Sequence, residues 1–145
     1  MNVSEIMASI VQTVDEDQPL VEVAGLMKEY DIGCIAVGKD TLEGLITDRD
    51  IVCRAVASGK PVDQTTAGDV MTRKPVTCRD DDTVKQAAAI MERNQVRRLP
   101  VLNYHGDLVG IVSMGDIGTH APHELAGELV EEVSRAEHRN LAETA

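Results

Sequence analysis

The pattern of apolar and polar residues follows the same order twice along this 145-residue chain. In the first pass, short apolar runs at residues 13–14, 35–37 and 42–46 are typical of buried strands. A longer segment with helical spacing separates the first two strands, and a second helix opens after the third. The predicted order is therefore β-α-β-β-α. The second pass repeats it, with strands at residues 77–78, 99–102 and 108–112.

The long helix of each copy is predicted from apolar residues at i, i+3, i+4 and i+7, which fall on one face. We expect each helix to bury one such stripe: Leu20, Val23, Ala24 and Met27 in the first copy, and Val84, Ala87, Ala88 and Met91 in the second. The last helix of the first copy is expected to bury Ile51, Val52, Ala55 and Val56. The core is predicted to be aliphatic, because the chain has no Trp or Phe and only two Tyr.

The two copies align over most of their length, which identifies an internal repeat. Residues 6–37 match residues 70–101 without a gap, and Gly44 to Ile51 match Gly110 to Ile117. Gly, Pro and Ser between the copies favour a linker. We predict a first repeat at residues 1–58, a linker at residues 59–66, a second repeat at residues 67–121 and a C-terminal helical tail at residues 122–145.

The predicted tail helix is amphipathic. Its apolar residues recur about every four positions, at Leu125, Leu129, Val133 and Ala136, with Glu and Arg between them. Two interpretations fit this pattern. The tail either caps its own repeat or provides a contact between the subunits of a dimer.

The formal net charge of −11 limits the partners of this protein. Such an acidic chain repels nucleic-acid backbones and anionic membrane surfaces, and it lacks the aromatic residues that stack on single-stranded bases. No apolar run approaches the roughly 20 residues of a membrane span. We therefore expect no nucleic-acid partner and no membrane partner. A small anionic ligand would need a local cationic pocket.

The three cysteines, Cys34, Cys53 and Cys78, are odd in number and form no C-x-x-C motif. Mostly buried, reduced thiols in a cytoplasmic protein are the favoured interpretation. The N-terminal residues show no cationic region followed by an apolar stretch, so no signal peptide is predicted. Nucleotide-binding loops and nucleophile motifs are also missing, and we expect no enzymatic activity.

One motif occurs at the same place in both repeats, where the third strand leads into the last helix. It reads Thr47-Asp48-Arg49-Asp50-Ile51 in the first repeat and Ser113-Met114-Gly115-Asp116-Ile117 in the second. A hydroxyl residue followed three positions later by Asp is also an ordinary helix cap. The motif alone therefore does not distinguish a cap from a ligand site.

Together with the repeat, this motif resembles a tandem pair of CBS (cystathionine-β-synthase) domains, often called a Bateman module. The segment Val96-Arg97-Arg98-Leu99-Pro100-Val101 and the lead-ins Ile6-Met7 and Val70-Met71-Thr72 are also typical of that family. The resemblance covers about residues 1 to 120. It implies an α+β fold in which two β-α-β-β-α repeats pack sheet to sheet around a pseudo-two-fold axis, with the tail helix added. It also implies a homodimer.

The resemblance further implies that the protein binds an adenosyl compound as a regulatory ligand. AMP, ADP, ATP, NAD and S-adenosylmethionine are the candidates, no cofactor is required, and the signal would pass in trans to an unknown protein partner. At the matching positions, Asp50 and Asp116 would accept the ribose hydroxyls. Thr47 and Ser113 would donate to phosphate beside the free N–H groups of the helix start.

Four strand residues complete the site that the resemblance implies. Thr13 and Thr77, on the first strand of each repeat, would face the nucleotide held by the opposite repeat. Ile35 and Leu99 would line the base.

The two sites are predicted to differ in charge. In the first, Arg49 lies between the hydroxyl residue and Asp50 and is a plausible phosphate partner. The second has Met114-Gly115 at these positions, so its cation would have to come from Arg97 or Arg98. We therefore predict one well-charged site in the first repeat and a weaker one in the second.

Two other functions are compatible with the sequence. One is a ligand-free dimeric interaction protein, in which side chains such as Arg98 fill the sites and the tail docks on a partner. The other is a metal- or redox-responsive stress protein that uses His120, His123 or a cysteine. Two histidines near Glu124 are a weak metal signal, and capping or solvated side chains are favoured, so we predict no metal site.

Overall fold

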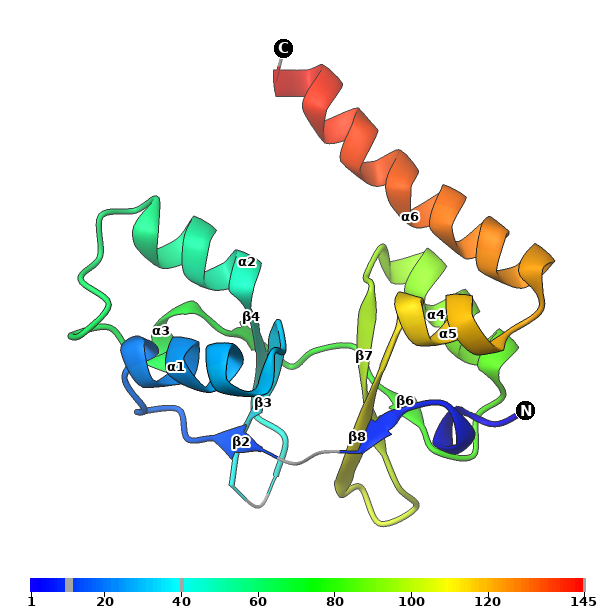
Figure 1. The fold of residues 1–145 in the computed structure, drawn as a ribbon, viewed down its shortest axis with the longest axis horizontal. Coiled ribbons are helices and arrows are strands. Elements are labelled where there is room, and N and C mark those ends of the chain that lie inside the picture. Colours follow the sequence, from blue (N-terminus) through cyan, green and yellow to red (C-terminus); the bar gives the residue numbers. More distant parts are fainter. Residues whose placement is uncertain (10–11, 40, 145) are drawn as a thin grey trace. The chain divides into compact units, whose positions relative to one another are not determined.

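The computed structural model describes residues 1–9, 12–39 and 41–144, with side chains up to residue 135. The chain forms two compact units (Figure 1). Val11–Pro75 form one, here called the first-repeat unit, and Met1–Ile10 together with Val76–Ala145 form the other, here called the second-repeat unit. Each unit contains one four-stranded sheet with helices, so the predicted α+β fold is confirmed.

The first-repeat unit follows the predicted order β-α-β-β-α and adds one short helix and one strand. Its sheet has the order β2-β3-β4-β5, in which β2 runs parallel to β3 and the other neighbours are antiparallel. Its elements are β2 (Thr13–Val14), α1 (Leu20–Tyr30), β3 (Cys34–Val37), β4 (Gly44–Thr47), α2 (Asp48–Ile51), a π-helical turn η2 (Val52–Val56) that continues α2, α3 (Ala67–Val70) and β5 (Thr72–Arg73).

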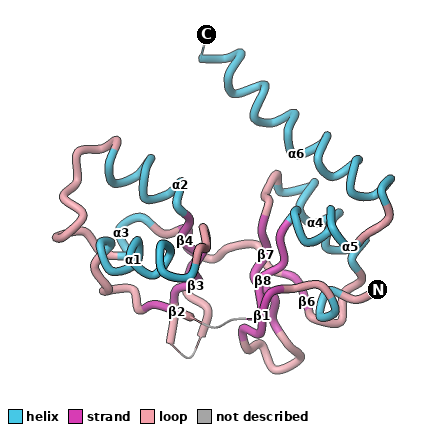
Figure 2. Tube along the Cα trace, in the orientation of Figure 1, coloured by secondary structure: helices cyan, strands magenta, loops and turns pink. Residues whose placement is uncertain are grey.

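The second-repeat unit has the same order and adds the tail helix (Figure 2). Its sheet order is β1-β8-β7-β6, with β6 parallel to β7 and the other neighbours antiparallel. Its elements are η1 (Val3–Glu5), β1 (Ala8–Ser9), β6 (Cys78–Arg79), α4 (Val84–Asn94), β7 (Arg98–Leu102), β8 (Leu108–Ser113), α5 (Met114–His120) and α6 (His123–Thr144).

The edge strands β1 and β5 were not predicted from the sequence. Strand β1 precedes the other strands of the first repeat but pairs with β8, and β5 precedes the other strands of the second repeat but pairs with β4. Ser9 lies opposite Gly110, and Arg73 lies opposite Gly44. The lead-in of each repeat therefore completes the sheet of the other repeat's unit.

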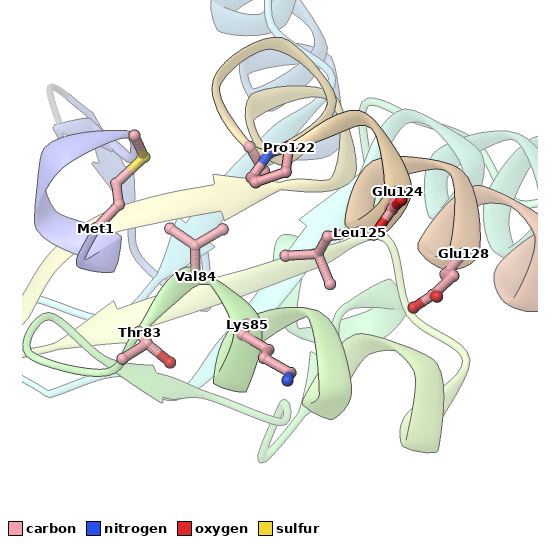
Figure 3. Close-up of a pocket in the computed structure, with 9 residues that line it drawn as sticks. Met1, Thr83, Val84, Lys85, Pro122, Glu124, Leu125 and Glu128 are labelled. Atoms are coloured by element: carbon pink, nitrogen blue, oxygen red, sulfur yellow. The ribbon is translucent and has the colours of Figure 1, made fainter.

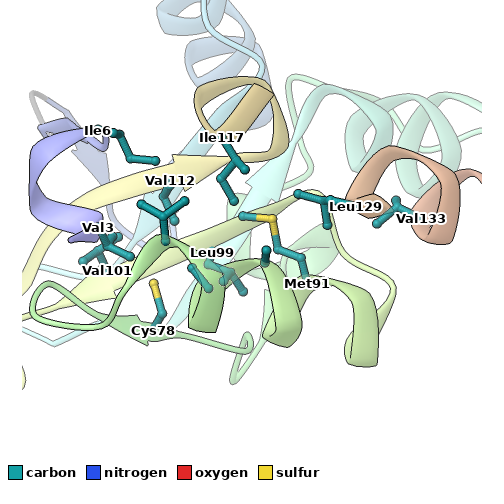
Figure 4. Close-up of a cluster of buried hydrophobic side chains, with 13 residues drawn as sticks. Val3, Ile6, Cys78, Met91, Leu99, Val101, Val112, Ile117, Leu129 and Val133 are labelled. Carbon is teal, nitrogen blue, oxygen red and sulfur yellow. The ribbon is translucent and has the colours of Figure 1, made fainter. Parts of the chain in front are cut away.

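Each unit has its own aliphatic core. In the second-repeat unit, side chains from η1, the sheet, α4, α5 and α6 meet in one cluster (Figure 4). The predicted helical stripe of α4 is fully buried there. The stripe of α1 is buried at Leu20, Val23 and Met27, but Ala24 is exposed, contrary to the prediction.

The tail helix α6 covers the helices of the second-repeat unit. It contacts α4 and α5, and Leu129 and Val133 are 0% and 3% exposed in the core of that unit. Leu125 packs against the same core. The contacts support the interpretation of the tail as an end-cap. The side chain of Ala136, predicted to belong to this stripe, lies outside the described residues.

The last helix of the first repeat buries fewer residues than predicted. Ile51 and Ala55 are buried, but Val52 and Val56 are 57% and 59% exposed. These valines stay exposed because, within the described part of the first-repeat unit, no second helix packs on α2 and η2 as α6 packs on α5. Among the described residues, no helix has the length and apolar character needed to cross a membrane.

Candidate functional site

The two repeated motifs adopt the same local geometry, a reciprocal helix cap. In the first-repeat unit, the N–H of Asp50 donates to Thr47 Oγ1 at 3.1 Å, and Asp50 Oδ2 accepts the N–H of Thr47 at 2.9 Å. In the second-repeat unit, Ser113 and Asp116 make the same pair of bonds at 3.1 and 2.8 Å. The cap interpretation is therefore correct for both motifs.

Capping leaves each motif able to bind a ligand. A hydroxyl oxygen that accepts one hydrogen bond still has its own O–H to donate, and a carboxylate offers about four acceptor positions on two oxygens. In both caps the carboxylate uses Oδ2 to accept the backbone N–H. Oδ1 of Asp50 and of Asp116 therefore takes no part in the cap, Oδ2 keeps one acceptor position, and the cap fixes the orientation of the carboxylate.

The first motif includes a cation that the sequence analysis missed. Arg54, on η2, has its Nε 3.7 Å from Asp50 Oδ1, with side chains 49% and 15% exposed. The same guanidinium donates from Nη1 to the carbonyl oxygens of Val70 and Met71, at 3.0 and 3.2 Å. The i, i+4 spacing of Asp50 and Arg54 was the signal that could have identified the pair.

The aligned residue in the second-repeat unit is His120, which behaves differently. Its ring Nδ1 lies 2.9 Å from the carbonyl oxygen of Asp116, one turn earlier in α5. Because a carbonyl oxygen only accepts, Nδ1 carries the proton and donates. The two motifs therefore share their caps but not the side chain that follows one turn later.

The two predicted arginines lie on different elements of their units. Arg49 is exposed in the first turn of α2. Arg98 is half-buried on β7, and the antiparallel register places it directly opposite Ser113. Residues in that relation have Cβ atoms about 4.5–5.5 Å apart on one face of the sheet. Cys34 stands opposite Thr47 at the equivalent place in the first-repeat unit.

The four strand residues predicted to complete the site fall into two kinds. Thr13 is exposed on β2, and Thr77 is half-buried just before β6. The side chains of Ile35 and Leu99 belong to the two cores, at 1% and 0% exposure. A ligand beside these two residues would therefore meet their backbone rather than their side chains.

The ten predicted residues thus divide between the units. The first-repeat unit holds Thr13, Ile35, Thr47, Arg49 and Asp50, and the second-repeat unit holds Thr77, Arg98, Leu99, Ser113 and Asp116.

The described residues show little that favours metal or thiol chemistry. They contain no group of three or more His, Cys, Asp or Glu side chains arranged to hold a metal ion. Burial, together with the nearby Asp82 carboxylate, raises the pKa of the Cys78 thiol to about 12, so it stays protonated near neutral pH. Cys53 is exposed on η2, contrary to the expectation of mostly buried thiols.

A separate groove of about 540 Å³ lies in the second-repeat unit, between the N-terminus and the starts of α4 and α6 (Figure 3). Met1, Val84, Pro122 and Leu125 provide apolar walls, and Lys85, Glu124 and Glu128 lie along it. None of the ten predicted site residues lines this groove. It is therefore distinct from the two capped motifs.

Two β-α-β-β-α repeats, each with a hydroxyl residue and a carboxylate at the start of the helix that follows its third strand (α2 and α5), define a class of tandem-repeat ligand-binding modules. The sequence matches the CBS domain family over residues 3–56 and again over residues 67–119. The chain therefore belongs to the CBS domain family and carries the domain as a tandem pair.

Three similar proteins place the chain within this family. Hypoxic response protein 1 of Mycobacterium tuberculosis is 34% identical over 131 residues, which cover 89% of this chain and 91% of that protein. A crystal structure of Hypoxic Response Protein I, with two coordinated zinc ions, has a TM-score of 0.74 and 35% identity over 84% of this chain and all of that chain.

The other two are structures with adenosyl ligands. CBSX2 in complex with AMP has a TM-score of 0.70 and 26% identity, covering 83% of this chain and 95% of that chain. The CBS domain pair of MJ0100, in complex with 5′-methylthioadenosine and S-adenosyl-L-methionine, has a TM-score of 0.74 and 26% identity. That match covers 82% of this chain and 98% of the other.

Proposed function

We propose that this protein is a regulatory module that binds an adenine nucleotide or a related adenosyl compound and acts in trans on a protein partner. The observation that carries the proposal is the pair of capped motifs, each of which holds a carboxylate and a hydroxyl in fixed orientation. The AMP complex of CBSX2 and the methylthioadenosine and S-adenosylmethionine complex of MJ0100 support the choice of ligand class.

The carboxylates provide the group that recognises ribose. Two neighbouring ribose hydroxyls donate to one carboxylate, and charge-assisted hydrogen bonds of this kind are stronger than neutral ones. The caps hold Asp50 and Asp116 so that Oδ1 and the remaining acceptor position of Oδ2 are left for this role. The hydroxyls of Thr47 and Ser113 then donate to a phosphate or another acceptor on the same ligand.

The surrounding charges make the two proposed sites unequal. Arg49 lies within the first motif itself, whereas the second motif has Met114-Gly115 at these positions and Arg98 lies on the neighbouring strand. A phosphate carries more negative charge than a methylthioadenosine or a sulfonium compound. We therefore expect the first motif to favour phosphorylated ligands and the second to be weaker for them.

Calorimetric titration and thermal unfolding with AMP, ATP, NAD and S-adenosylmethionine test the proposal. A ligand at 100 times its Kd should raise the free energy of unfolding by about 2.7 kcal/mol. For AMP, Asp50→Asn should weaken binding about tenfold or more, because it removes the charge on the ribose acceptor but keeps an oxygen that can cap the helix. Asp116→Asn should have a smaller effect.

The matched control is an AMP analogue that lacks both the 2′ and the 3′ hydroxyl. If Asp50 reads the ribose, Asp50→Asn should leave the binding of this analogue nearly unchanged while it weakens AMP. The proposal fails if none of the four ligands shifts the unfolding transition at millimolar concentration.

We also propose that the exposed helices of the first-repeat unit form a homodimer contact. Ala24 is exposed, whereas the aligned Ala88 in the second-repeat unit is 0% exposed in a core that includes α6. Val21, Val52 and Val56 are 50% to 59% exposed on α1 and η2. A second copy of the chain would remove these valines from water, and burial is favourable for such residues.

The double variant Val52→Asp, Val56→Asp should convert this dimer to a monomer, because two charges would have to be buried in the contact. Light scattering after size-exclusion chromatography measures the mass. Val130→Asp on the tail, where the side chain is 45% exposed, is the control and should leave the mass unchanged. An unchanged dimer in the Val52 and Val56 variant, or a wild-type protein that is already monomeric, would exclude this surface.

A further inference from the structure

Arg54 joins two parts of the first-repeat unit that are far apart in sequence. On one side its Nε faces Asp50 Oδ1 at 3.7 Å. On the other, its Nη1 donates to the carbonyl oxygens of Val70 and Met71, at the end of α3. Strand β5 follows at once, and the chain leaves this unit at Pro75. Arg54 therefore connects the carboxylate of the capped motif to the segment that leads into the other unit.

We propose that Arg54 is a positioning residue that couples ligand occupancy at Asp50 to the segment formed by α3 and β5. This inference rests on the proposed ligand-binding function and specifies how the first site is regulated. The ribose hydroxyls and Arg54 compete at Oδ1 of Asp50, because the N–H of Thr47 already takes one acceptor position of Oδ2 and two hydroxyls need more than the one that is left there. A bound ribose weakens the hold of Asp50 on Arg54, and Arg54 then holds the two carbonyls less firmly.

The chemistry of the contact requires arginine. A guanidinium has five N–H donors in a fixed plane, so it can face a carboxylate with one nitrogen and carbonyl oxygens with another. The carbonyls at the end of a helix carry partial negative charge, which favours a cation there. Arg54 also lies within η2, whose π-helical hydrogen bonding is a local departure from the regular helix and is frequent at functional sites.

The second-repeat unit provides an internal comparison. Its aligned residue, His120, donates to the carbonyl of Asp116 within its own helix. In the described residues, His120 makes no bridge to the lead-in that contains Ile6 and Met7. The coupling is therefore specific to the first-repeat unit, and Asp116 is a matched control for Asp50, since both carboxylates make the same cap.

The first arm of the test needs no ligand. Amide hydrogen exchange of a peptide spanning residues 70–75 is compared in Asp50→Asn, Asp116→Asn and Arg54→Gln. We expect exchange of this peptide to rise about threefold in Asp50→Asn, where one partly exposed ion pair is lost. It should rise about tenfold in Arg54→Gln, where the carbonyl bonds are lost as well. Asp116→Asn should leave exchange of the 70–75 peptide unchanged, because Asp116 makes the same cap as Asp50 but, among the described residues, has no contact with an arginine that binds this segment.

The second arm adds AMP at saturating concentration and measures exchange relative to β3 of the same unit. AMP should raise exchange of the peptide in the wild type, as Asp50→Asn does without ligand. In Arg54→Gln, calorimetry should still detect AMP binding, but AMP should cause no further change in exchange of the 70–75 peptide. Arg54→Lys keeps the charge but loses the planar guanidinium with its several N–H donors. This variant should bind AMP, and exchange of its 70–75 peptide should respond only weakly. Circular dichroism of each variant confirms that it is folded.

The outcomes separate this inference from the proposed function. If Asp50→Asn behaves as Asp116→Asn does, Arg54 does not link Asp50 to the segment, whether or not AMP binds. If AMP binds and the segment responds equally in Arg54→Gln, the coupling does not pass through Arg54. If the ligand-free arm succeeds but no adenosyl ligand binds, the proposed function fails and regulation by occupancy fails with it, while the link between Asp50 and the segment remains.

Discussion

Replacing Gly44 with valine is expected to lower the free energy of unfolding by about 3 kcal/mol, at the upper end of the usual range for overpacking. A Cβ at this position would lie 2.6 Å from Met71 Sδ and 2.8 Å from the carbonyl oxygen of Thr72. The methionine can move, but the carbonyl belongs to β5, which pairs with β4 at this point. The side chain would therefore separate β5 from the sheet.

The other sheet has the same feature, which provides an internal replicate. A Cβ at Gly110 would lie 2.5 Å from Met7 Sδ and 2.8 Å from the carbonyl oxygen of Ala8, on the edge strand β1. Gly110→Val should therefore cause a similar loss. Urea denaturation followed by circular dichroism measures both variants.

Gly25→Ala is the control, with an expected effect of the opposite sign. Gly25 lies inside α1, and a Cβ there would meet nothing within 4 Å apart from its chain neighbours and the backbone of its own helix. Alanine in an exposed helix interior gains about 0.5–1 kcal/mol over glycine. If Gly44→Val and Gly110→Val unfold at the wild-type urea concentration, the close approach of the edge strands does not contribute to stability.

These glycines also mark the part of the fold that was not predicted from the sequence, the two edge strands. The repeat and the order β-α-β-β-α depend on local periodicity, and both were predicted correctly. Strands β1 and β5 have two residues each and, unlike the equally short β2 and β6, bury neither of them, so no apolar run marks them in the sequence. Their pairing partners are also distant in sequence. Gly44 and Gly110, at matching places in two predicted strands, were the available signal, since glycine in a strand often marks a close backbone approach.

The exposed valines illustrate a different limit. Helical periodicity identifies which side chains share a face, but not whether another element covers that face. The aligned residues Ala24 and Ala88 have the same identity and the same spacing, yet only Ala88 is buried. The predicted burial of Val52 and Val56 was wrong for the same reason.

For the candidate site, the sequence identified the residues but not their neighbours. Thr47, Asp50, Ser113 and Asp116 follow from the repeat, and their caps follow from spacing. The position of Arg98 opposite Ser113 depends on strand register, and the contacts of Arg54 with Val70 and Met71 depend on the fold. An arginine therefore lies beside each motif in a chain whose formal net charge is −11. The net charge of the chain alone could not have indicated these local positive charges.

The second large effect is expected for Leu129→Ala in the tail helix. Leu129 is 0% exposed and belongs to the core of the second-repeat unit, so truncation leaves a cavity between α6 and the helices that it covers. Substitutions of this kind lower the free energy of unfolding by about 2–5 kcal/mol. Urea denaturation measures the loss, and hydrogen exchange should show it in α4 and α5 but not in α1.

Val130→Ala is the matched control, because Val130 is the next residue in the same helix and is 45% exposed. Substitutions at such positions usually change stability by less than about 0.5 kcal/mol. Comparable losses in both variants would indicate a general loss of helix α6 rather than a lost core contact. If Leu129→Ala changes the mass in solution but not the stability, the tail contributes to a contact between subunits instead of the end-cap. The end-cap interpretation requires a large difference in stability between these two neighbours, with the mass unchanged in both.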